Sequence, residues 1–396
     1  MSKFNQLIDL DESSKTKIQS RRALEEVRRN RQILQTKGTG PTRSADKTLK
    51  EKKFKAPKGF SNQSNYCYLN SIAQSLLLLP SFQEILKNPP PGVLFHAFTS
   101  LFEDYSKEAV AGPLDASVIY KALKEVQPRV CNHQPEDQED AQEFLCLILE
   151  ALHWECIKSK DQDQNNSDGE LAKDTQVRSE DGWMEVGRKG TVSEKRVHKE
   201  LPSPICRLFS GSTRISLKGK SKTTTSSNSL SSVIIEPFYT FPVQLPDHPA
   251  DLQISLQEAI EKSFTVERIE QIRRQQMFED TPQVLILHLK RIVYRNGELI
   301  KSLVKVQVDP RLKLYSNLEG MLSFKLRAII YHHGRSAYGG HYSCAVRIDP
   351  PDAIKDEDDL WYFVDDRIIT RTTLEAVLDM SIPTRTSYLL FYEKSQ

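Results

Sequence analysis

Cys67 is the residue whose type and setting first suggest chemistry. It lies in SNQSNYCYLNSIAQSLLLLP at 61–80, between a polar, turn-forming segment and an apolar run with helical spacing. A cysteine at a helix N-terminus meets free N–H groups and the positive end of the helix dipole, which favour a thiolate. Most lone cysteines are only small buried side chains, so a nucleophile also requires a base and an oxyanion donor.

A candidate base lies far along the chain, in YHHGRSAYGGHYSCAV at 331–346. His341 follows two glycines at the start of an expected strand, and glycine allows a substrate backbone to approach closely. The alternative is a glycine-rich hairpin with an incidental histidine. Asp365 and Asp366 end another expected strand, LWYFVDD, and could orient an imidazole. A cysteine, a histidine and an aspartate so far apart form a thiol-protease site only if the fold brings them together.

The elements that would position these residues differ between the two halves of the chain. Residues 59–156 contain two stretches of helical spacing, at 68–79 and 138–153, and are predicted to be mostly helical. From 233 onward, short β-branched and aromatic runs predict strands, with one helix in ISLQEAIEKSF. Helices followed by strands predict an α+β protein in which the helices pack on an antiparallel sheet.

Three segments lack apolar periodicity and are predicted to lie outside the core. Residues 1–58 form a basic arm, with 16 Lys and Arg against seven Asp and Glu, which we expect to be disordered and available to an unknown protein partner. Residues 157–200 are predicted to be a mobile insertion, within which DGWMEVG could dock as a patch. Residues 218–232 are predicted to be a loop.

Composition narrows the class of protein. The 396 residues carry a formal net charge of +2, so bulk charge indicates neither a nucleic acid nor a membrane as partner. The six cysteines are scattered and include no C-x-x-C pair, which argues against a zinc ribbon and a disulfide scaffold. No secretory signal opens the sequence and no apolar run reaches membrane-spanning length, so we expect a protein of the cytoplasm or also of the nucleus.

Five ordered motifs resemble those of the ubiquitin-specific proteases. GFSNQSNYCYLNS is similar to the cysteine box of that family, and QEDAQEFL at 138–145 is similar to its Q-x-D-A-x-E-F box. PQVLILHLKRI resembles the family's P-x-V-L-x-L-H-L-K-R-F strand, HHG…GGHY…WYFVDD its histidine box, and SYLLFY its closing strand. Together these motifs span residues 59–393, which makes the resemblance much stronger than any single match.

The resemblance implies a role for each matching residue. Cys67 would be the nucleophile, His341 the general base, and Asp365 the acid that orients His341. Asn62, five residues before Cys67, falls where the family places its oxyanion-stabilising amide. Asp366, the second acid of the pair, is expected to matter less than Asp365.

The resemblance also implies residues that bind the substrate. Asp140 and Glu143 match acidic positions of the cleft that receives ubiquitin's arginine-containing tail, where charge-assisted contacts between carboxylate and guanidinium are strong. Gly340 and Tyr342, on either side of His341, are also predicted to contact the substrate. Without the resemblance, the two acids would be interpreted as ordinary solvated charges on a helix.

The fold implied by the resemblance is the papain-like cysteine peptidase fold, with a catalytic domain at 59–395. A helical thumb would occupy 59–205, and a sheet-rich palm and fingers 206–395. The fingers would hold no zinc, because the paired cysteines of many members are absent, and no cofactor is implied. One further departure is Ser64, which stands where the family usually has glycine.

The implied activity is hydrolysis of the isopeptide or peptide bond after the C-terminal glycine of ubiquitin, with ubiquitin and ubiquitinated proteins as partners. Two other functions stay open. A catalytically dead ubiquitin-binding scaffold would be indicated by missing triad members, but all three are present. A papain-type general peptidase would be indicated by the signature C-G-[SA]-C-[WY], which the sequence lacks.

Overall fold

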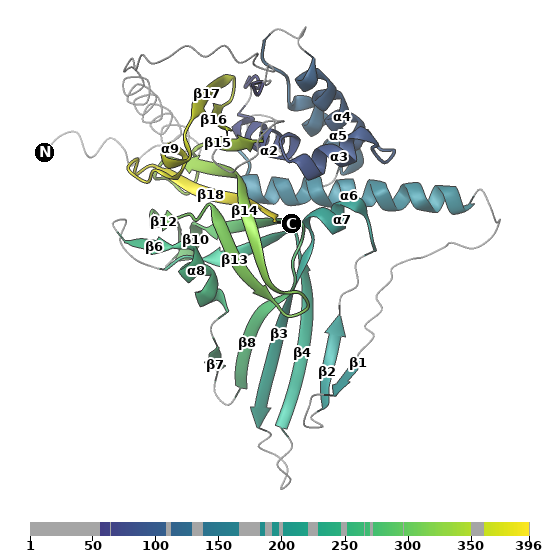
Figure 1. The fold of residues 1–396 in the computed structure, drawn as a ribbon, viewed down its shortest axis with the longest axis vertical. Coiled ribbons are helices and arrows are strands. Elements are labelled where there is room, and N and C mark those ends of the chain that lie inside the picture. Colours follow the sequence, from purple (N-terminus) through teal and green to yellow (C-terminus); the bar gives the residue numbers. More distant parts are fainter. Residues whose placement is uncertain are drawn as a thin grey trace, which may run out of the picture.

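The computed structural model consists of a layer of helices packed on one end of a long, curved sheet (Figure 1). The predicted basic arm at 1–58 lies outside the described residues except for its last three. In the described part, no helix combines the length and the apolar composition needed to cross a bilayer. The residues that the structure describes are 56–63, 65–107, 112–128, 138–165, 183–186, 192–197, 201–220, 229–246, 252–264, 266–269, 272–295, 297–349 and 360–395.

The helical layer is built mainly from the first half of the described chain. Every residue of the helix that begins at Cys67 is buried, because this helix lies between the other helices and the sheet. Figure 1 shows the longest helix running beneath the smaller ones and across the top of the strands. The bounds are α2 (Cys67–Leu77), α3 (Pro80–Lys87), α4 (Val93–Ser106), α5 (Ser117–Val126), α6 (Ala141–Asn165) and α7 (Pro204–Phe209).

The two helices predicted from apolar spacing are present, with different lengths. α2 agrees closely with the prediction at 68–79, whereas α6 starts three residues after the predicted 138 and continues twelve residues past 153. The start of α6 is set by Asp140, whose Oδ1 accepts the backbone N–H of Gln142 at 2.7 Å.

The predicted insertion at 157–200 contains helix and strand where the structure describes it, which its polar composition did not predict. α6 extends to Asn165, and two short strands, β1 (Trp183–Val186) and β2 (Val192–Val197), follow. β1 pairs with β2, and β2 pairs with a long strand of the main sheet. Backbone pairing supplies order here that the polar composition did not predict.

The second half of the described chain is rich in strands, as predicted. The predicted loop at 218–232 is narrower than expected, since the strands on either side reach Lys220 and restart at Ser229. The strands of this half are β3 (Gly211–Lys220), β4 (Ser229–Phe238), β5 (Thr240–Gln244), β6 (Gln253–Ser255), β7 (Glu267–Ile269), β8 (Ile272–Asp280), β9 (Val284–Lys290), β10 (Ile292–Arg295), β11 (Glu298–Lys301), β12 (Lys305–Gln307), β13 (Arg311–Ser316), β14 (Gly320–His333), β15 (His341–Ile348), β16 (Leu360–Asp365), β17 (Ile368–Thr372) and β18 (Arg385–Lys394). Two short helices, α8 (Leu256–Ser263) and α9 (Leu374–Leu378), connect them.

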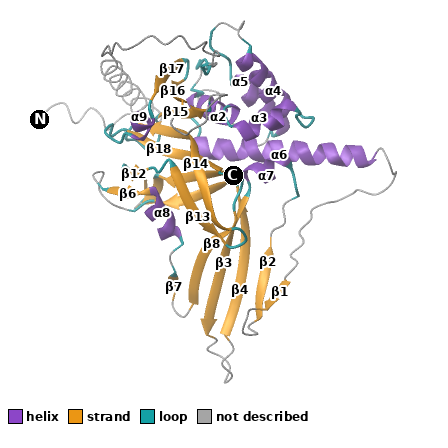
Figure 2. Cartoon of the chain, in the orientation of Figure 1, coloured by secondary structure: helices purple, strands orange, loops and turns teal. Residues whose placement is uncertain are grey.

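In the described chain, fourteen strands form one sheet in the order β1-β2-β4-β3-β8-β13-β14-β15-β16-β17, with β18 beside β14, β9 beside β18, β5 beside β9, and β7 beside β8. Most neighbours are antiparallel, but three pairs are parallel, namely β2 with β4, β5 with β9, and β8 with β13. Figure 2 shows the long strands β3, β4 and β8 projecting away from the helices, while β14 to β18 lie against them. None of the described residues in the projecting strands is a cysteine. The absence of zinc stays a prediction.

The core has two parts, one on each face of the central strands. In β9, Val284 and Ile286 face the helical layer, whereas Leu285 and Leu287 face the cluster around α8. Because successive side chains of a strand point to opposite faces, a strand buried on both sides has a continuous apolar sequence, as VLILHL does here. The helical layer is therefore fixed against the strands that carry the candidate site.

Candidate active site

The three predicted catalytic residues meet where α2 contacts two neighbouring strands. Cys67 is the first residue of α2, His341 the first of β15, and Asp365 the last of β16. Antiparallel pairing places the start of β15 beside the end of β16. Nε2 of His341 lies 2.6 Å from Oδ1 of Asp365, and the Cys67 thiol forms a hydrogen bond with the same imidazole. All three side chains are buried, with Cys67 only 2% exposed.

Opposing effects act on the pKa of His341. Burial alone would lower this pKa, because an imidazolium loses hydration inside the protein. The charges of Cys67 and Asp365, with the hydrogen bonds to both, outweigh burial and raise the pKa of His341 well above its ordinary value. The imidazole therefore carries its second proton at neutral pH, in the form that pairs with a thiolate and can protonate a leaving amine. Because Nε2 is bonded to Asp365, Nδ1 is the nitrogen that faces Cys67.

Asn62, the predicted oxyanion donor, is held at both ends of its amide. Its Oδ1 accepts the backbone N–H of Tyr66 at 2.9 Å, and its Nδ2 donates to Oδ2 of Asp366 at 3.0 Å. An amide NH₂ group has two hydrogens, so the second N–H remains for an oxyanion. The side chain is exposed to solvent, where a substrate carbonyl can approach.

Asp366 has partners that the sequence did not reveal. Its Oδ1 accepts Nδ2 of Asn70 at 2.9 Å, and Asn70 also donates to the carbonyl of Ser61 at 3.1 Å. The backbone carbonyl of Asp366 accepts the N–H of Phe60 at 3.0 Å. Asp366 thus fixes the segment that precedes the nucleophile, whereas its neighbour in the sequence contacts the base.

Two residues near this segment have left-handed backbone conformations. Asn65 and Asp366 both have φ of 52°, a region that asparagine and aspartate tolerate better than most side chains. Ser64, which stands where the family usually has glycine, lies outside the described residues. In the described part of the cysteine box, the left-handed turn falls on Asn65.

One set of possible metal ligands among the described residues includes two members of the triad. Single ligand atoms of His341, Asp365 and Asp366 lie within 4.8 Å of one another. Each carboxylate already has protein partners, namely the imidazole for Asp365 and two asparagine amides for Asp366. These contacts account for the cluster as part of a thiol-hydrolase site.

The two acids predicted to bind a substrate lie in different settings. Asp140 uses both carboxylate oxygens within the protein, because Oδ1 caps α6 and Oδ2 accepts the Tyr388 hydroxyl at 2.5 Å. Glu143 lies in the first turn of α6 and is exposed. The carboxylate of Glu143 is therefore the more accessible of the two to a cationic substrate group.

Gly340 and Tyr342 flank His341 and are both buried. A Cβ at Gly340 would lie 2.3 Å from Nε2 of His332 and 2.3 Å from the carbonyl of His333, so only glycine fits there. Tyr342 is 5% exposed, and its ring stacks on His332 at a centroid distance of 4.8 Å. The Tyr342 side chain packs inside the protein instead of forming the surface of a cleft.

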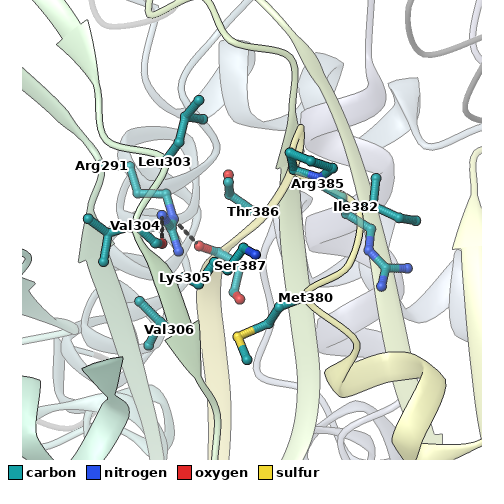
Figure 3. Close-up of a pocket in the computed structure, with 11 residues that line it drawn as sticks. Arg291, Leu303, Val304, Lys305, Val306, Met380, Ile382, Arg385, Thr386 and Ser387 are labelled. Atoms are coloured by element: carbon teal, nitrogen blue, oxygen red, sulfur yellow. Dashed lines mark hydrogen bonds between the residues drawn. The ribbon is translucent and has the colours of Figure 1, made fainter. Parts of the chain in front are cut away.

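A separate pocket lies on the sheet side of the molecule and contains none of the triad residues. Figure 3 shows the guanidinium of Arg291 at its wall, hydrogen bonded to the carbonyls of Val304 and Ser387. These bonds measure 2.9 and 2.5 Å, and Arg291 is 1% exposed. The buried guanidinium of Arg291 thus connects β18 to the segment that follows β11. Its burial in the pocket wall is explained by this structural role.

Three residues near the triad were missed by sequence analysis. Asn70 and Gln138 lie in motifs that were recognised, CYLNS and QEDAQEFL, so the motifs themselves carried the signal. No sequence pattern pointed to Lys301, because a lysine in a polar hairpin is normally solvated. It is 7% exposed, and its Nζ donates to the carbonyls of His332 at 3.1 Å and Gly334 at 2.6 Å.

The α+β fold and the Cys–His–Asp site together define a thiol hydrolase of the papain-like class. Residues 58–392 match the family described as ubiquitin carboxyl-terminal hydrolase, and this chain belongs to that family. The predicted family is thereby confirmed. The known activity of this family is that of a cysteine-type deubiquitinase, which agrees with the predicted function.

Curated relatives carry the same family name. A probable ubiquitin carboxyl-terminal hydrolase 3 of Schizosaccharomyces pombe is 28% identical, over 85% of this chain and 74% of the relative. Ubiquitin carboxyl-terminal hydrolase 10 of Rattus norvegicus is 26% identical, over 85% of this chain and 48% of the relative. The chain thus spans about half the length of the second relative.

Solved structures with a similar fold include ubiquitin complexes. The SAGA DUB module of Ubp8, Sgf11, Sus1 and Sgf73 bound to monoubiquitin matches with a TM-score of 0.61 and 18% identity, over 86% of this chain and 69% of that chain. The module bound to ubiquitin aldehyde matches with a TM-score of 0.60 and 17% identity, over 86% and 70%. At these identities the likeness concerns the fold alone, and it confirms the predicted fold class.

Proposed function

We propose that this chain hydrolyses the isopeptide or peptide bond after the C-terminal glycine of ubiquitin, with Cys67, His341 and Asp365 as its catalytic triad. The observation that carries the proposal is the 2.6 Å contact between His341 Nε2 and Asp365 Oδ1, beside a cysteine at the N-terminus of α2. Membership in the ubiquitin carboxyl-terminal hydrolase family supports the substrate class.

The first half of the reaction forms a thioester. The Cys67 thiolate attacks the carbonyl carbon of the terminal glycine, and the carbonyl oxygen becomes an oxyanion that accepts the remaining N–H of Asn62. The tetrahedral intermediate collapses when the bond to the lysine or α-amine breaks. His341 donates its proton to that amine, which leaves as a neutral group.

The second half releases ubiquitin. The imidazole of His341, now neutral, takes a proton from a water molecule that attacks the thioester carbonyl. Cys67 leaves as a thiolate, and the imidazolium forms again. Asp365 keeps Nε2 of His341 engaged through both halves, so Nδ1 exchanges the proton each time.

Ubiquitin and ubiquitinated proteins are the proposed partners. Support comes from structural neighbours that were solved bound to monoubiquitin and to ubiquitin aldehyde. We assign the arginine-containing tail of ubiquitin to the region of Asp140 and Glu143, where an exposed carboxylate on α6 suits a guanidinium. Oδ1 of Asp140 already accepts the N–H groups of Gln142 and Glu143, so only Oδ2, which accepts the Tyr388 hydroxyl, can accept a further hydrogen bond.

The alternative of a ubiquitin-binding scaffold without activity has no specific observation in its favour. Such a scaffold would be expected to have lost the contacts that serve only the reaction. Here the contacts of His341 with Asp365, at 2.6 Å, and of Asn62 with Asp366, at 3.0 Å, are both short enough to be hydrogen bonds.

The proposal is tested with ubiquitin that bears a C-terminal electrophile, followed by mass spectrometry of the adduct. We expect one ubiquitin per chain, attached at Cys67, and no adduct with Cys67→Ala. The same variant should lose cleavage of a ubiquitin–fluorophore amide yet still bind ubiquitin, because affinity arises from a broad protein surface while the covalent step needs the thiol. Cleavage by Cys67→Ala at the wild-type rate would end the proposal.

A further inference from the structure

Gln138 makes a contact that ties the helical layer to the residue before the catalytic histidine. Its Oε1 accepts the backbone N–H of Gly340 at 3.0 Å, and its Nε2 donates to the carbonyl of Gly340 at 2.7 Å. A side-chain amide thus satisfies both backbone groups of one residue, as a neighbouring strand would. The two residues are 202 positions apart in the sequence.

The position of Gly340 is restricted from its other side as well. A side chain there would collide with the His332 ring and the His333 carbonyl, so this backbone packs closely against β14. Gln138 on one side and β14 on the other leave the peptide of Gly340 little freedom. His341 follows directly, so the direction of that peptide determines where the imidazole stands relative to Cys67.

The segment that carries Gln138 is itself anchored to the sheet. Asp140 accepts the hydroxyl of Tyr388 from β18, and the Tyr342 hydroxyl forms a hydrogen bond with the backbone of Ala141. These bonds hold the start of α6 against β15 and β18. Gln138 is therefore presented to Gly340 by a segment that is fixed two and three residues further on.

The solvent exposure of Gln138 suggests that its hydrogen bonds affect folding and catalysis to different degrees. Its side chain is accessible to solvent, where water competes for the same groups and the net stabilisation from a hydrogen bond is small. Geometry at the reacting atoms is more sensitive, because a misplacement of about 1 Å can cost roughly 100-fold in rate. The two bonds to Gly340 should therefore affect the reaction much more than the folding.

We propose that Gln138 is a positioning residue, which fixes the peptide of Gly340 and through it holds the His341 imidazole against Cys67. The inference rests on the proposed function, since it assigns Gln138 a part in that same reaction. Gln138 would act through the backbone of Gly340. The roles proposed for Cys67, His341 and Asp365 stay as they are.

The test compares Gln138→Met, which keeps the length of the side chain and removes both hydrogen bonds, with Gln142→Met. Gln142 lies four residues further along the chain, in the first turn of α6, and donates to Thr240 at 3.0 Å, so it provides a matched control away from His341. On a ubiquitin–fluorophore amide we expect Gln138→Met to lower kcat about 10- to 100-fold, with KM within about twofold. Gln142→Met should keep the wild-type kcat, and both variants should melt within a few degrees of each other.

A partial rescue adds a second comparison. Gln138→Glu retains an acceptor for the Gly340 N–H but has no donor for the Gly340 carbonyl, so its kcat should fall between those of the wild type and Gln138→Met. A role limited to folding would instead make kcat follow the melting temperature across all three variants.

Alkylation of Cys67 gives a readout that does not require ubiquitin. The rate of carbamidomethylation by iodoacetamide is measured against pH on the Cys67 peptide by mass spectrometry. For Gln138→Met we expect a rate about tenfold lower near pH 6.5 but close to the wild-type rate near pH 10, where the thiolate forms without help from an imidazolium.

The outcomes separate the inference from the proposed function. An unchanged kcat and an unchanged alkylation profile in Gln138→Met would overturn the positioning role. A higher kcat/KM would also overturn it, because Gln138 would then be a latch that closes the site. If the wild type is alkylated at Cys67 near pH 6.5 but does not cleave the ubiquitin amide, the proposed function fails, while the alkylation profile still decides the role of Gln138.

Discussion

Asp365 and Asp366 are adjacent in the sequence but act on different groups. Oδ1 of Asp365 lies 2.6 Å from the imidazole of His341, while Asp366 accepts the amides of Asn62 and Asn70. Replacing the first changes the base, and replacing the second changes the support of the oxyanion donor. The two substitutions should therefore have separable kinetic effects.

We expect Asp365→Asn to lower kcat by about 100-fold or more, because an amide no longer fixes the tautomer of His341 or stabilises its charge. Asp366→Asn should cost less, since the Asn62 carbonyl remains held by the Tyr66 N–H. Steady-state kinetics on a ubiquitin–fluorophore amide would measure both. A larger loss for Asp366→Asn would transfer the more important role to the second aspartate.

Asn62 should matter for the transition state more than for binding. Loss of a preorganised donor to an oxyanion typically costs about 100- to 1000-fold in kcat, so Asn62→Ala should reduce kcat by that amount with little change in KM. Gln63→Ala, at the exposed neighbouring position, is the control and should behave as wild type. Equal effects of the two substitutions would mean that the loop as a whole, and not the amide of Asn62, carries the activity.

At the scale of elements, a buried lysine supports the segment that leads to His341. Lys301 ends β11 and donates to the carbonyls of His332 and Gly334, at the end of β14. Burial and the nearby Arg291 lower the pKa of Lys301 to about 7. These bonds hold one end of the loop between β14 and β15, and Gln138 holds the other.

We expect Lys301→Met to lower kcat about tenfold, because the loop before His341 loses one of its two anchors. Lys313→Met, at an exposed position of β13, should leave kcat unchanged. Kinetics on the ubiquitin–fluorophore amide would again be the measurement. If Lys301→Met keeps the wild-type kcat, the contacts with Gln138 and β14 are sufficient to position the loop before His341.

A buried carboxylate fixes another pair of elements. The side chain of Glu155 in α6 accepts the backbone N–H groups of Leu94 and Phe95 at 2.8 and 3.0 Å, and so caps the N-terminus of α4. Glu155→Ala would leave two buried N–H groups without an acceptor and should reduce the free energy of unfolding by about 2 kcal/mol. Glu84→Ala, on the exposed side of α3, should change it by less than about 0.5 kcal/mol.

Urea unfolding curves would measure both variants. Because Glu155 lies in the helical layer and not among the triad residues, kcat at 25 °C should stay unchanged in Glu155→Ala. A stability equal to the wild type would mean that water replaces the carboxylate at the start of α4.

At the scale of the whole molecule, buried histidines make stability depend on pH. Burial lowers the pKa of His288 to about 4, and lowers those of His332 and His333 well below the ordinary value. The unfolded chain binds protons at these residues below about pH 6.5, whereas the folded chain does not, so the free energy of unfolding falls as the pH falls. His341 has the opposite sign, since its raised pKa stabilises the fold below about pH 6.5 and loses this effect at high pH.

We therefore expect stability to decline between about pH 6.5 and 4.5, with a slope of roughly 1.4 kcal/mol per pH unit for each buried neutral histidine. Urea titrations at several pH values would measure the slope. His288→Gln should make the slope shallower by the contribution of about one bound proton, roughly 1.4 kcal/mol per pH unit. If the variant kept the wild-type slope, the acid sensitivity would belong to other groups.

The sequence alone determined the types of most elements and pointed to the proposed catalytic groups. Apolar spacing of 3.6 residues and runs of β-branched side chains are local properties, so α2 and strands such as β9 and β15 could be predicted. Cys67, His341, Asp365 and Asn62 followed from motifs that stand within short stretches.

The tertiary structure alone decided how far α6 extends, that β1 and β2 join the sheet, and which groups support the triad. The contacts of Asp366 with Asn62, of Lys301 with Gly334 and of Gln138 with Gly340 connect segments that no local pattern relates. Their formation depends on strand register and on how the helical layer docks, to within a fraction of an ångström. Such long-range geometry results from packing of the whole core and not from the preference of any single segment.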